Sequence, residues 1–164
     1  MATATWIKNE LEDHGVTFEE LHHRDAFSAQ DIARREHVSG HRVAKVVVVM
    51  ADDRPVVLVL PASRRIVLDR VKDILGTGFV RLATQHEIED YFPDCEDGAL
   101  PPFRHWEGVD VLMDGYLHVT GDIVFQAGTH RDAVRMNFGD WFELVLPRVE
   151  MFSERNHGRP PYRE

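Results

Sequence analysis

An apolar run with a single internal cation constrains the fold of this chain more than any other segment. Residues 42–50 read Arg-Val-Ala-Lys-Val-Val-Val-Val-Met, which is typical of a buried β-strand. Side chains alternate between the two faces of a strand, so Lys45 shares a face with Val43 and Val47. An unpaired ammonium inside such a strand is costly. Lys45 therefore either reaches water at the end of the strand or lines a pocket for a polar or anionic ligand.

Size and composition bound the class of protein. A chain of 164 residues, 43% hydrophobic and 29% charged, fits one globular domain, and we find no internal repeat or linker. There is no run of 18 apolar residues and no basic-then-apolar N-terminus. We therefore expect no membrane span, no secretory signal and a cytoplasmic location. Cys95 is the only cysteine, which excludes an internal disulfide and argues against a thiolate zinc site.

The charges are unevenly distributed. The net charge of −9 argues against broad, non-specific adhesion to nucleic acid, because such adhesion needs a basic surface. Bases gather between residues 34 and 72, whereas the segment 84–98 is acidic. The first block allows a local basic patch and the second a surface for a protein partner. Both blocks also fit solvated helix faces.

Hydrophobic spacing and turn residues predict one α+β domain. Helices are predicted at 4–14, from Ser28 to before Gly40, and at 66–75, 84–92 and 138–147; strands are predicted at 16–21, 43–50, 56–60, 79–82, 109–113, 116–119, 123–127 and 133–137. The runs between 43 and 60 indicate a hairpin of two buried strands. The loop from Pro93 to Gly108 is too long for a simple connector. We expect residues 1–152 to form the domain and the charged tail, 153–164, to be disordered.

Two glycine-containing segments are candidates for ligand binding. Gly98 leads into Pro101-Pro102-Phe103, where two prolines stiffen the backbone. This loop either presents backbone groups to a ligand or is a rigid connector with Phe103 in the core. The segment Gly128-Thr129-His130 directly follows a predicted strand. Free N–H groups in such a turn can bind an oxyanion or phosphate, and a plain hairpin turn is the alternative.

We expect neither a metal nor a cofactor. His22 and His23 are adjacent and would point to opposite faces of a strand, and His37 and His41 straddle Gly40, where the helix should already have ended. The sequence contains no His-Glu-x-x-His, no phosphate-binding loop and no dinucleotide-binding glycine pattern. No serine, cysteine or threonine lies in a recognisable nucleophile motif.

In combination, these segments resemble a known family. The helix start at Ser28, the strand lysine Lys45, the loop from Gly98 and the turn at Gly128 follow one another as in the YbaK/prolyl-tRNA synthetase-associated domains, which are free-standing aminoacyl-tRNA deacylases. The resemblance covers about residues 15–147. It implies an α+β fold with a central mixed, barrel-like sheet flanked by helices. The implied reaction is hydrolysis of the ester of a mischarged tRNA, first of all a small amino acid such as Ala or Cys on tRNA-Pro.

The resemblance also implies roles for single residues and partners. Lys45 would hold the tRNA terminus through phosphate or ribose oxygens, and the turn would orient the ester and water. The implied catalytic set is Lys45, Gly128, Thr129 and His130, and the implied substrate-binding set is Ser28, Gly98, Pro101, Pro102 and Phe103. The acceptor end of an aminoacyl-tRNA is the expected partner, with a synthetase as a further candidate.

The sequence departs from the family pattern at two points. The family loop commonly continues Pro-Phe-Gly, whereas Arg104 and His105 follow Phe103 here, and the turn often carries Ser in place of Thr129. Because of these departures, the resemblance specifies the reaction more closely than the amino acid that is removed. Two other readings stay open: a non-catalytic tRNA- or nucleotide-binding module of the same fold, and a protein-interaction domain that uses the acidic segment 84–98. Turnover separates the first of these from a deacylase.

The implied chemistry agrees with the absence of a triad motif. An aminoacyl ester is already activated, so a site needs positioning and oxyanion stabilisation rather than a strong nucleophile. Selection of a small side chain by pocket shape is weak, about 1–3 kcal/mol per methylene, which gives a separate editing domain its rationale.

Overall fold

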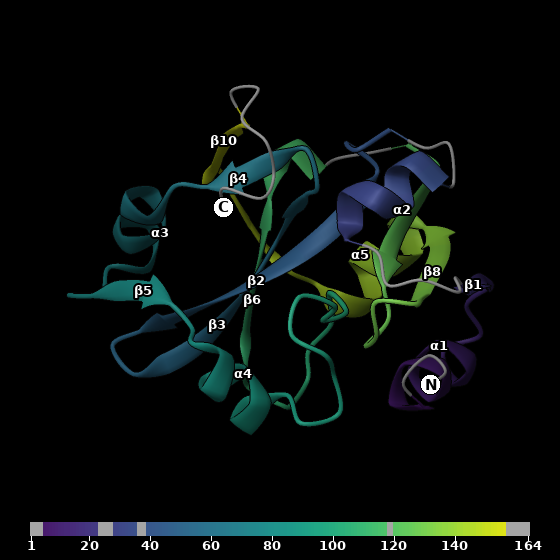
Figure 1. Cartoon of the computed structure of the whole chain (residues 1–164), viewed down its shortest axis with the longest axis horizontal. Coiled ribbons are helices and arrows are strands. Elements are labelled where there is room, and N and C mark those ends of the chain that lie inside the picture. The colour runs from purple at the N-terminus through teal and green to yellow at the C-terminus, as the bar shows by residue number, and fades with distance from the viewer. Residues whose placement is uncertain (1–4, 23–27, 36–38, 118–119, 157–164) are drawn as a thin grey trace.

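One mixed sheet organises the chain. The computed structural model describes residues 5–22, 28–35, 39–117 and 120–156 (Figure 1). The elements are α1 (Thr5–Asp13), β1 (Phe18–His22), α2 (Ala29–Arg35), β2 (Val43–Ala51), β3 (Arg54–Pro61), β4 (Arg64–Ile66), α3 (Leu68–Leu75), β5 (Val80–Leu82), α4 (Gln85–Tyr91), β6 (Asp110–Asp114), the 3-10 helix η1 (Gly115–Leu117), β7 (Asp122–Gln126), β8 (Asp132–Asn137), α5 (Phe138–Val145), β9 (Arg148–Glu150) and β10 (Ser153–Arg155). The predicted α+β domain with a mixed sheet and flanking helices is confirmed. Within these described segments, no helix has the length and apolar character needed to cross a membrane.

The strands of the main sheet are not in chain order. Neighbours follow the order β1-β8-β7-β2-β3-β6-β9, and β5 also pairs with β2. The pairs β2/β7, β3/β6 and β6/β9 are parallel, and the other pairs of this sheet are antiparallel. The sheet curls so that β8 and β6, which are far apart in this order, contribute side chains to one core cluster. Strands β4 and β10 form a separate antiparallel pair.

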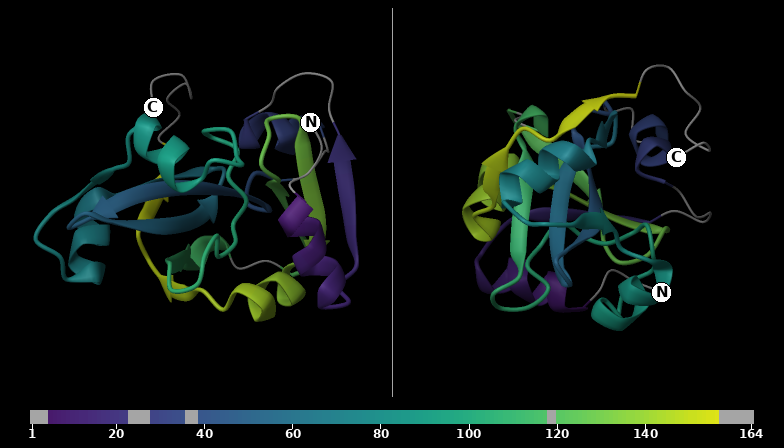
Figure 2. Two further views of the ribbon diagram at one scale, coloured as in Figure 1. Left: turned by 90° about the horizontal axis from the view of Figure 1, so that it is seen from below. Right: turned by 90° about the vertical axis from the view of Figure 1, so that its left-hand side faces the viewer.

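The predicted hairpin is confirmed. β2 and β3 pair along their length, and Asp52 and Asp53 form the turn with φ of 48° and 70°. Two consecutive residues with positive φ are typical of the type I′ turns that match the twist of a hairpin. In Figure 1 this hairpin crosses the molecule from α3 and β5 on one side toward α2 and α5 on the other, and Figure 2 shows the same elements from two further directions.

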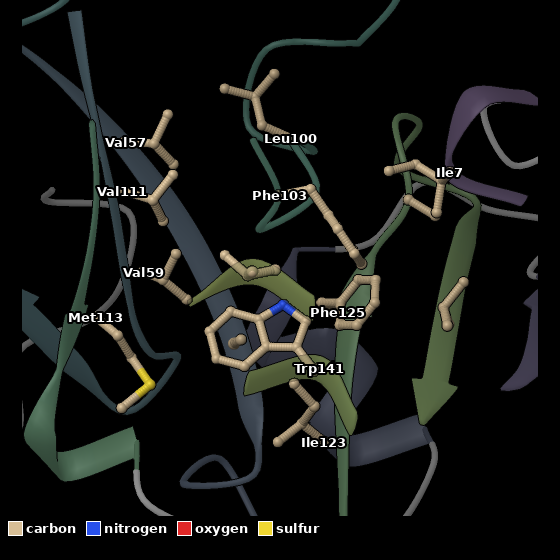
Figure 3. Close-up of a cluster of buried hydrophobic side chains, with 14 of the residues drawn as sticks. Ile7, Val57, Val59, Leu100, Phe103, Val111, Met113, Ile123, Phe125 and Trp141 are labelled. Carbon is tan, nitrogen blue, oxygen red and sulfur yellow. The ribbon is translucent and has the colours of Figure 1, made fainter. Parts of the chain in front are cut away.

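Both faces of β2 are covered, as the apolar run predicts. On one face Ala44 and Val48 join the largest apolar cluster, in which Phe103, Phe125 and Trp141 lie close together (Figure 3). The opposite face of the strand packs under α2 and α3. Each large apolar side chain buried in this way contributes about 1.5–3 kcal/mol relative to an exposed one. The double covering therefore holds β2 in one position.

A capping box begins α4, the helix predicted from residue 84. Thr84 Oγ1 accepts the amide of Glu87 at 3.2 Å, and Glu87 Oε1 accepts the amide of Thr84 at 2.9 Å. Arg81 donates two further hydrogen bonds to the same carboxylate, each at 2.7 Å. The bonds from Arg81 and then from the Thr84 amide lower the pKa of Glu87 to about 2.

The strand predicted at 116–119 is wrong for its described part. Residues Gly115–Leu117 form η1, and 118–119 lie outside the described residues. Asp114 ends β6, and its Oδ2 accepts the amide of Tyr116 at 3.0 Å. A side-chain bond to the backbone two residues on competes with strand pairing. Hydrophobic alternation does not reveal such a bond.

Two predicted helices are shorter in the structure because short strands adjoin them. Ile66 belongs to β4, and α3 begins at Leu68. α5 ends at Val145, Leu146 adopts φ of 49°, and the chain continues as β9 beside β6. The partners of β4 and β9 are distant in sequence, so the local pattern does not predict either strand.

The disorder expected from Ser153 onward is wrong for the first residues of that tail. Ser153–Arg155 form β10 on β4. The carboxylate of Asp114, 0% exposed, accepts the amides of Phe152 and Ser153 at 3.0 and 3.1 Å. Arg64 donates to Ser153 Oγ at 2.7 Å. A buried carboxylate with these donors orders the backbone that precedes β10, and the rest of the predicted tail lies outside the described residues.

We expect Asp114→Ala to lower the free energy of unfolding by about 3 kcal/mol or more. The amides of Tyr116, Phe152 and Ser153 would lose their acceptor, and each buried donor left unsatisfied costs about 1–3 kcal/mol. Urea unfolding followed by tryptophan fluorescence measures the change. The control is Asp110→Ala, an exposed aspartate on the same strand, for which we expect less than about 0.5 kcal/mol. Equal losses in the two variants would contradict this role of Asp114.

Candidate functional site

The sheet divides beside β2. One edge of β2 pairs with β3 throughout, whereas the other edge pairs with β7 at residues 43–44 and with β5 at residues 49–51. Residues 45–48 lie between these two partners. Lys45 is therefore the first residue of β2 beyond the last pair with β7. This position is where loops outside the sheet can approach the strand.

Lys45 lies on the face of β2 that also carries Val43 and Val47, which pack in the clusters under α2 and α3. It is half-buried and opposite Leu60 on β3. Gln126 ends β7 and comes one residue after the pair Ala44↔Phe125, as Lys45 does on β2. Alternation along both strands puts Lys45 and Gln126 on the same face. The sequence pattern did not single out Gln126, which is only 4% exposed in the structure. The available signal was a polar residue at the end of an apolar strand.

The glycine turn, residues 128–132, and the loop, residues 96–103, are hydrogen-bonded to each other. The amide of Gly128 donates to Ala99 O at 2.9 Å, and the amide of Glu96 donates to Gly128 O at 2.7 Å. Glu96 Oε1 also accepts the amide of His130 at 2.7 Å. The structure therefore brings together two segments that the sequence singled out separately. Glu96 is a supporting residue that sequence analysis placed only within the acidic segment.

Gly98 lies directly against His130. Its φ is +86°, and a Cβ at this position would lie 3.1 Å from His130 Cε1. His130 Nε2 lies 2.8 Å from the carbonyl oxygen of Asp97, which can only accept, so Nε2 carries the proton. Nδ1 is then an acceptor, and Gln126 Nε2 lies 3.5 Å from it. The imidazole thus connects the loop to the turn and to the end of β7.

Thr129 and Asp132 form a buried pair within the turn. Thr129 Oγ1 donates to Asp132 Oδ2 at 2.6 Å and accepts the amides of Arg131 and Asp132, each at 3.1 Å. Asp132 Oδ1 accepts a hydrogen bond from His22 Nδ1 at 2.6 Å. Thr129 is 4% exposed and Asp132 is 2% exposed. The Thr129 hydroxyl is therefore committed to the shape of the turn.

The amide of Thr129 differs from its neighbours. The amides of Gly128, His130, Arg131 and Asp132 all donate to acceptors of the protein. In the part of the chain that the structure describes, the Thr129 amide has no such acceptor. Buried backbone N–H groups almost always have a partner, so this amide marks a position for a water or ligand oxygen.

The second half of the predicted substrate loop, from Pro101 to Phe103, packs into the core. Pro102 O accepts Trp141 Nε1 at 2.9 Å. The ring of Phe103 is 2% exposed and its centroid lies 5.5 Å from that of Phe125 (Figure 3). This half of the loop matches the rigid-connector alternative. Only the part around Gly98 lies against the turn.

Ser28 caps α2. Its hydroxyl accepts the amide of Asp31 at 3.2 Å, and its own amide donates to Asp31 Oδ2 at 3.2 Å. The helix packs through Ile32 against the face of β2 that carries Val43. The side-chain hydrogen bonds that the structure shows for Ser28 are those to Asp31 within the cap. Its predicted part in substrate binding stays a prediction.

The two residues that follow Phe103, at one of the two departures from the family pattern, have structural partners. Arg104 donates to Val145 O at 3.1 Å and Leu146 O at 3.0 Å, at the C-terminal end of α5. The ring of His105 lies 4.9 Å from that of Trp6 and 4.6 Å from that of Phe92. Arg104 therefore binds the end of α5, and His105 packs among aromatic rings while its Nε2 lies 3.1 Å from Pro101 O.

The histidines do not form a metal site in the part of the chain that the structure describes. No group of three or more His, Cys, Asp or Glu side chains there could hold a metal ion. His41 Nδ1 lies 2.9 Å from Ser63 Oγ, and His23 and His37 lie outside the described residues. Two cavities of about 300 Å³ each are bordered by residues such as Val16 and Arg54 rather than by Lys45 or the turn.

Comparison with known proteins identifies the family. A family model described as the aminoacyl-tRNA editing domain matches residues 23–144, which contain Lys45, the loop and the turn. The chain belongs to this family of aminoacyl-tRNA editing domains. The resemblance to the YbaK/prolyl-tRNA synthetase-associated domains is thereby confirmed.

The editing domain is similar to part of two longer proteins. It is 25% identical over 114 residues to a proline--tRNA ligase of Latilactobacillus sakei subsp. sakei (strain 23K), covering 70% of this chain and 20% of the ligase. It is 27% identical over 106 residues to a proline--tRNA ligase of Streptococcus gordonii (strain Challis), covering 65% of this chain and 17% of the ligase. The editing domain thus aligns with about a fifth of the length of these ligases.

Solved structures share the fold of this editing domain. The hypothetical protein APE2540 has a TM-score of 0.81 at 19% identity, covering 90% of this chain and 99% of that one. A protein proposed to be a trans-editing enzyme for prolyl tRNA synthetase has a TM-score of 0.79 at 19% identity, covering 90% of this chain and 94% of that one. At this level of identity the similarity establishes the fold.

We expect a pH-dependent part of the stability to come from His105. Burial lowers the pKa of this imidazole from its usual 6.5, so below that pH the unfolded chain binds a proton that the folded protein excludes. The free energy of unfolding should therefore rise with pH up to about 6.5 and then level off, with the contribution lost as pH falls. Urea midpoints of wild type and His105→Phe from about pH 8 to about pH 5 measure this effect. If the stability of His105→Phe depends on pH as steeply as that of the wild type, this expectation is contradicted. The control is His86→Phe, which replaces an exposed histidine.

Proposed function

We propose that this editing domain is a trans-editing deacylase, which hydrolyses the ester between an amino acid and the 3′ end of a mischarged tRNA. The observation that carries the proposal is the amide of Thr129, a residue that is 4% exposed, because this amide has no acceptor among the described residues. An activated ester needs a donor for its carbonyl oxygen and a rigid frame more than it needs a strong nucleophile. Membership of the editing-domain family supports the substrate class.

In the proposed reaction, a water oxygen attacks the carbonyl carbon of the ester. Negative charge develops on the carbonyl oxygen, to which the Thr129 amide would donate. The bond to the ribose oxygen then breaks, and that oxygen takes up the proton released by the water. The products are the free amino acid and a tRNA with its terminal hydroxyl restored. One oxyanion donor of this kind is typically worth about 10²–10³ in rate.

Lys45 is proposed to hold the tRNA terminus through phosphate or ribose oxygens. Its half-buried place on β2, on the same face as Gln126, supports this role. Gly128, with φ of 105°, would let the backbone approach the ester closely. His130 would keep the loop on the turn through Asp97 O.

The remaining predicted residues are proposed to act less directly. The loop from Gly98 would wall the aminoacyl pocket, and Pro101, Pro102 and Phe103 would support that wall from the core. Ser28 would hold the start of α2 above Val43.

We propose Ala or Cys on tRNA-Pro as the first substrates to test. The similarity to part of two proline--tRNA ligases, and to a protein proposed to act in trans for prolyl tRNA synthetase, supports this choice. The acceptor end of the tRNA is the proposed partner, with a prolyl-tRNA synthetase as a second, in the cytoplasm.

The deciding experiment is deacylation of a panel of mischarged tRNAs that includes Ala-tRNA-Pro and Cys-tRNA-Pro. We expect release of amino acid by the wild type, and loss of at least about 100-fold in rate in Lys45→Ala because the terminus is no longer held. Lys72→Ala, which removes an exposed lysine of α3, is the control and should retain activity. An active Lys45→Ala would overturn the role of the lysine. Binding of tRNA without turnover across the panel would favour the non-catalytic module.

Gly98→Ala tests the contact between loop and turn. A methyl group here would lie 3.1 Å from His130 Cε1, so we expect the loop to shift and the deacylation rate to fall about 10-fold or more. Gly108→Ala is a matched control, because Gly108 also has positive φ, at +90°, but has nothing within 4 Å. It should cost about 1–2 kcal/mol of stability and leave the rate unchanged. If Gly98→Ala and Gly108→Ala deacylate the tRNA at equal rates, the contact between the loop and the turn is not needed for activity.

A further inference from the structure

Asp132 links the glycine turn to the first strand of the sheet. Its two carboxylate oxygens bind Thr129 Oγ1 and His22 Nδ1, each at 2.6 Å, and the residue is 2% exposed. We propose that Asp132 is a positioning residue that keeps the Thr129 amide available to substrate, and that His22 fixes the carboxylate. The proposal rests on the proposed deacylase function and assigns a role to two residues that the sequence did not single out for it.

Asp132 orients the hydroxyl of Thr129. Because this hydroxyl donates its proton to Asp132 Oδ2, its lone pairs are left to accept the amides of Arg131 and Asp132. Without the carboxylate, the hydroxyl could rotate and donate elsewhere. The carboxylate therefore determines which turn amides are consumed within the protein, and the Thr129 amide is the one that is not.

The loop holds the other side of the turn. The amides of Gly128 and His130 donate to Ala99 O and Glu96 Oε1, on the loop. The Thr129 amide is thus flanked by two amides, those of Gly128 and His130, that the loop holds. The next two amides along the chain are held by the Thr129 hydroxyl. A shift of the hydroxyl would change the direction of this amide, and oxyanion donors need positions accurate to a fraction of an ångström.

His22 pairs with the second oxygen of the Asp132 carboxylate. A buried carboxylate is costly unless its oxygens are paired. His22 lies opposite Asp132 in the β1/β8 register, and its Nδ1 occupies the oxygen that Thr129 does not use. On its other side, His22 Nε2 lies 3.6 Å from Glu20 Oε2, and Glu20 Oε1 lies 2.9 Å from Lys8 Nζ. The hydrogen bond from His22 Nδ1 is therefore the contact that holds Oδ1 of the Asp132 carboxylate.

The test uses the full chain and deacylation of the mischarged tRNA that the wild type accepts. We expect Thr129→Val and Asp132→Asn to lower kcat about 10-fold or more while KM changes less than about twofold, because substrate is still bound by Lys45 and the loop. Thr129→Ser keeps the hydroxyl and should restore kcat to within about twofold. The matched control is Thr77→Val, since the buried Thr77 hydroxyl has no hydrogen-bond partner among the described residues. Its kcat should equal that of wild type.

Amide hydrogen exchange, measured by NMR, gives a readout that does not depend on activity. In wild type we expect the Thr129 amide to exchange faster than those of Gly128 and Arg131, and in Thr129→Val we expect Arg131 to lose its protection. If the wild type deacylates no substrate, the proposed function fails, whereas the exchange pattern still decides the arrangement of the turn. Wild-type kcat in Thr129→Val, or a fall in kcat that only follows a loss of folded protein by circular dichroism, would overturn the positioning role. Should Asp132→Asn not fold, the comparison of Thr129→Val with Thr129→Ser carries the test.

Discussion

The pairing of β2 is the constraint on which the rest of the structure depends. β3 occupies one edge of this strand, β7 and β5 share the other, and apolar clusters cover both faces. Moving the strand would expose large apolar areas on both sides at once, so its one cation has a fixed place. Lys45 lies where β7 ends its pairing with β2, and the fold brings the loop and the turn to the end of β7. The burial of an apolar strand thus positions a polar residue.

The second determinant is the pairing of buried polar groups. Two buried carboxylates are used in the same way: Asp114 orders the chain before β10, and Asp132 orders the glycine turn. Each is almost completely buried and accepts hydrogen bonds from backbone or side-chain donors close in space. The turn then has nearly all its amides engaged, and the Thr129 amide stands out against that background. The function that we propose follows from this exception rather than from a catalytic motif.

The departures after Phe103 lose much of their weight once their contacts are known. Arg104 binds the carbonyl groups at the end of α5, and His105 packs between two aromatic rings. His105 Nε2 also lies 3.1 Å from Pro101 O, in the half of the loop that packs into the core. The non-catalytic alternative, which these departures had suggested, therefore depends on turnover measurements alone. The second half of the loop, with Phe103 in the core, similarly supports the site from behind.

The sequence by itself determined the hairpin around Lys45, the capped helix at Thr84 and the two glycine segments, because local spacing, turn residues and caps act within a few residues. Only the tertiary structure decided which segments meet. The contact of Gly98 with His130, the pairing of Asp132 with His22, and the short strands β4, β9 and β10 all join residues far apart in the chain. A three-residue strand has too little local signal, and a buried carboxylate is recognisable only by its partners. These long-range contacts depend on the order of the strands in the sheet. That order is set as the sheet curls around a common core, and no local pattern encodes it.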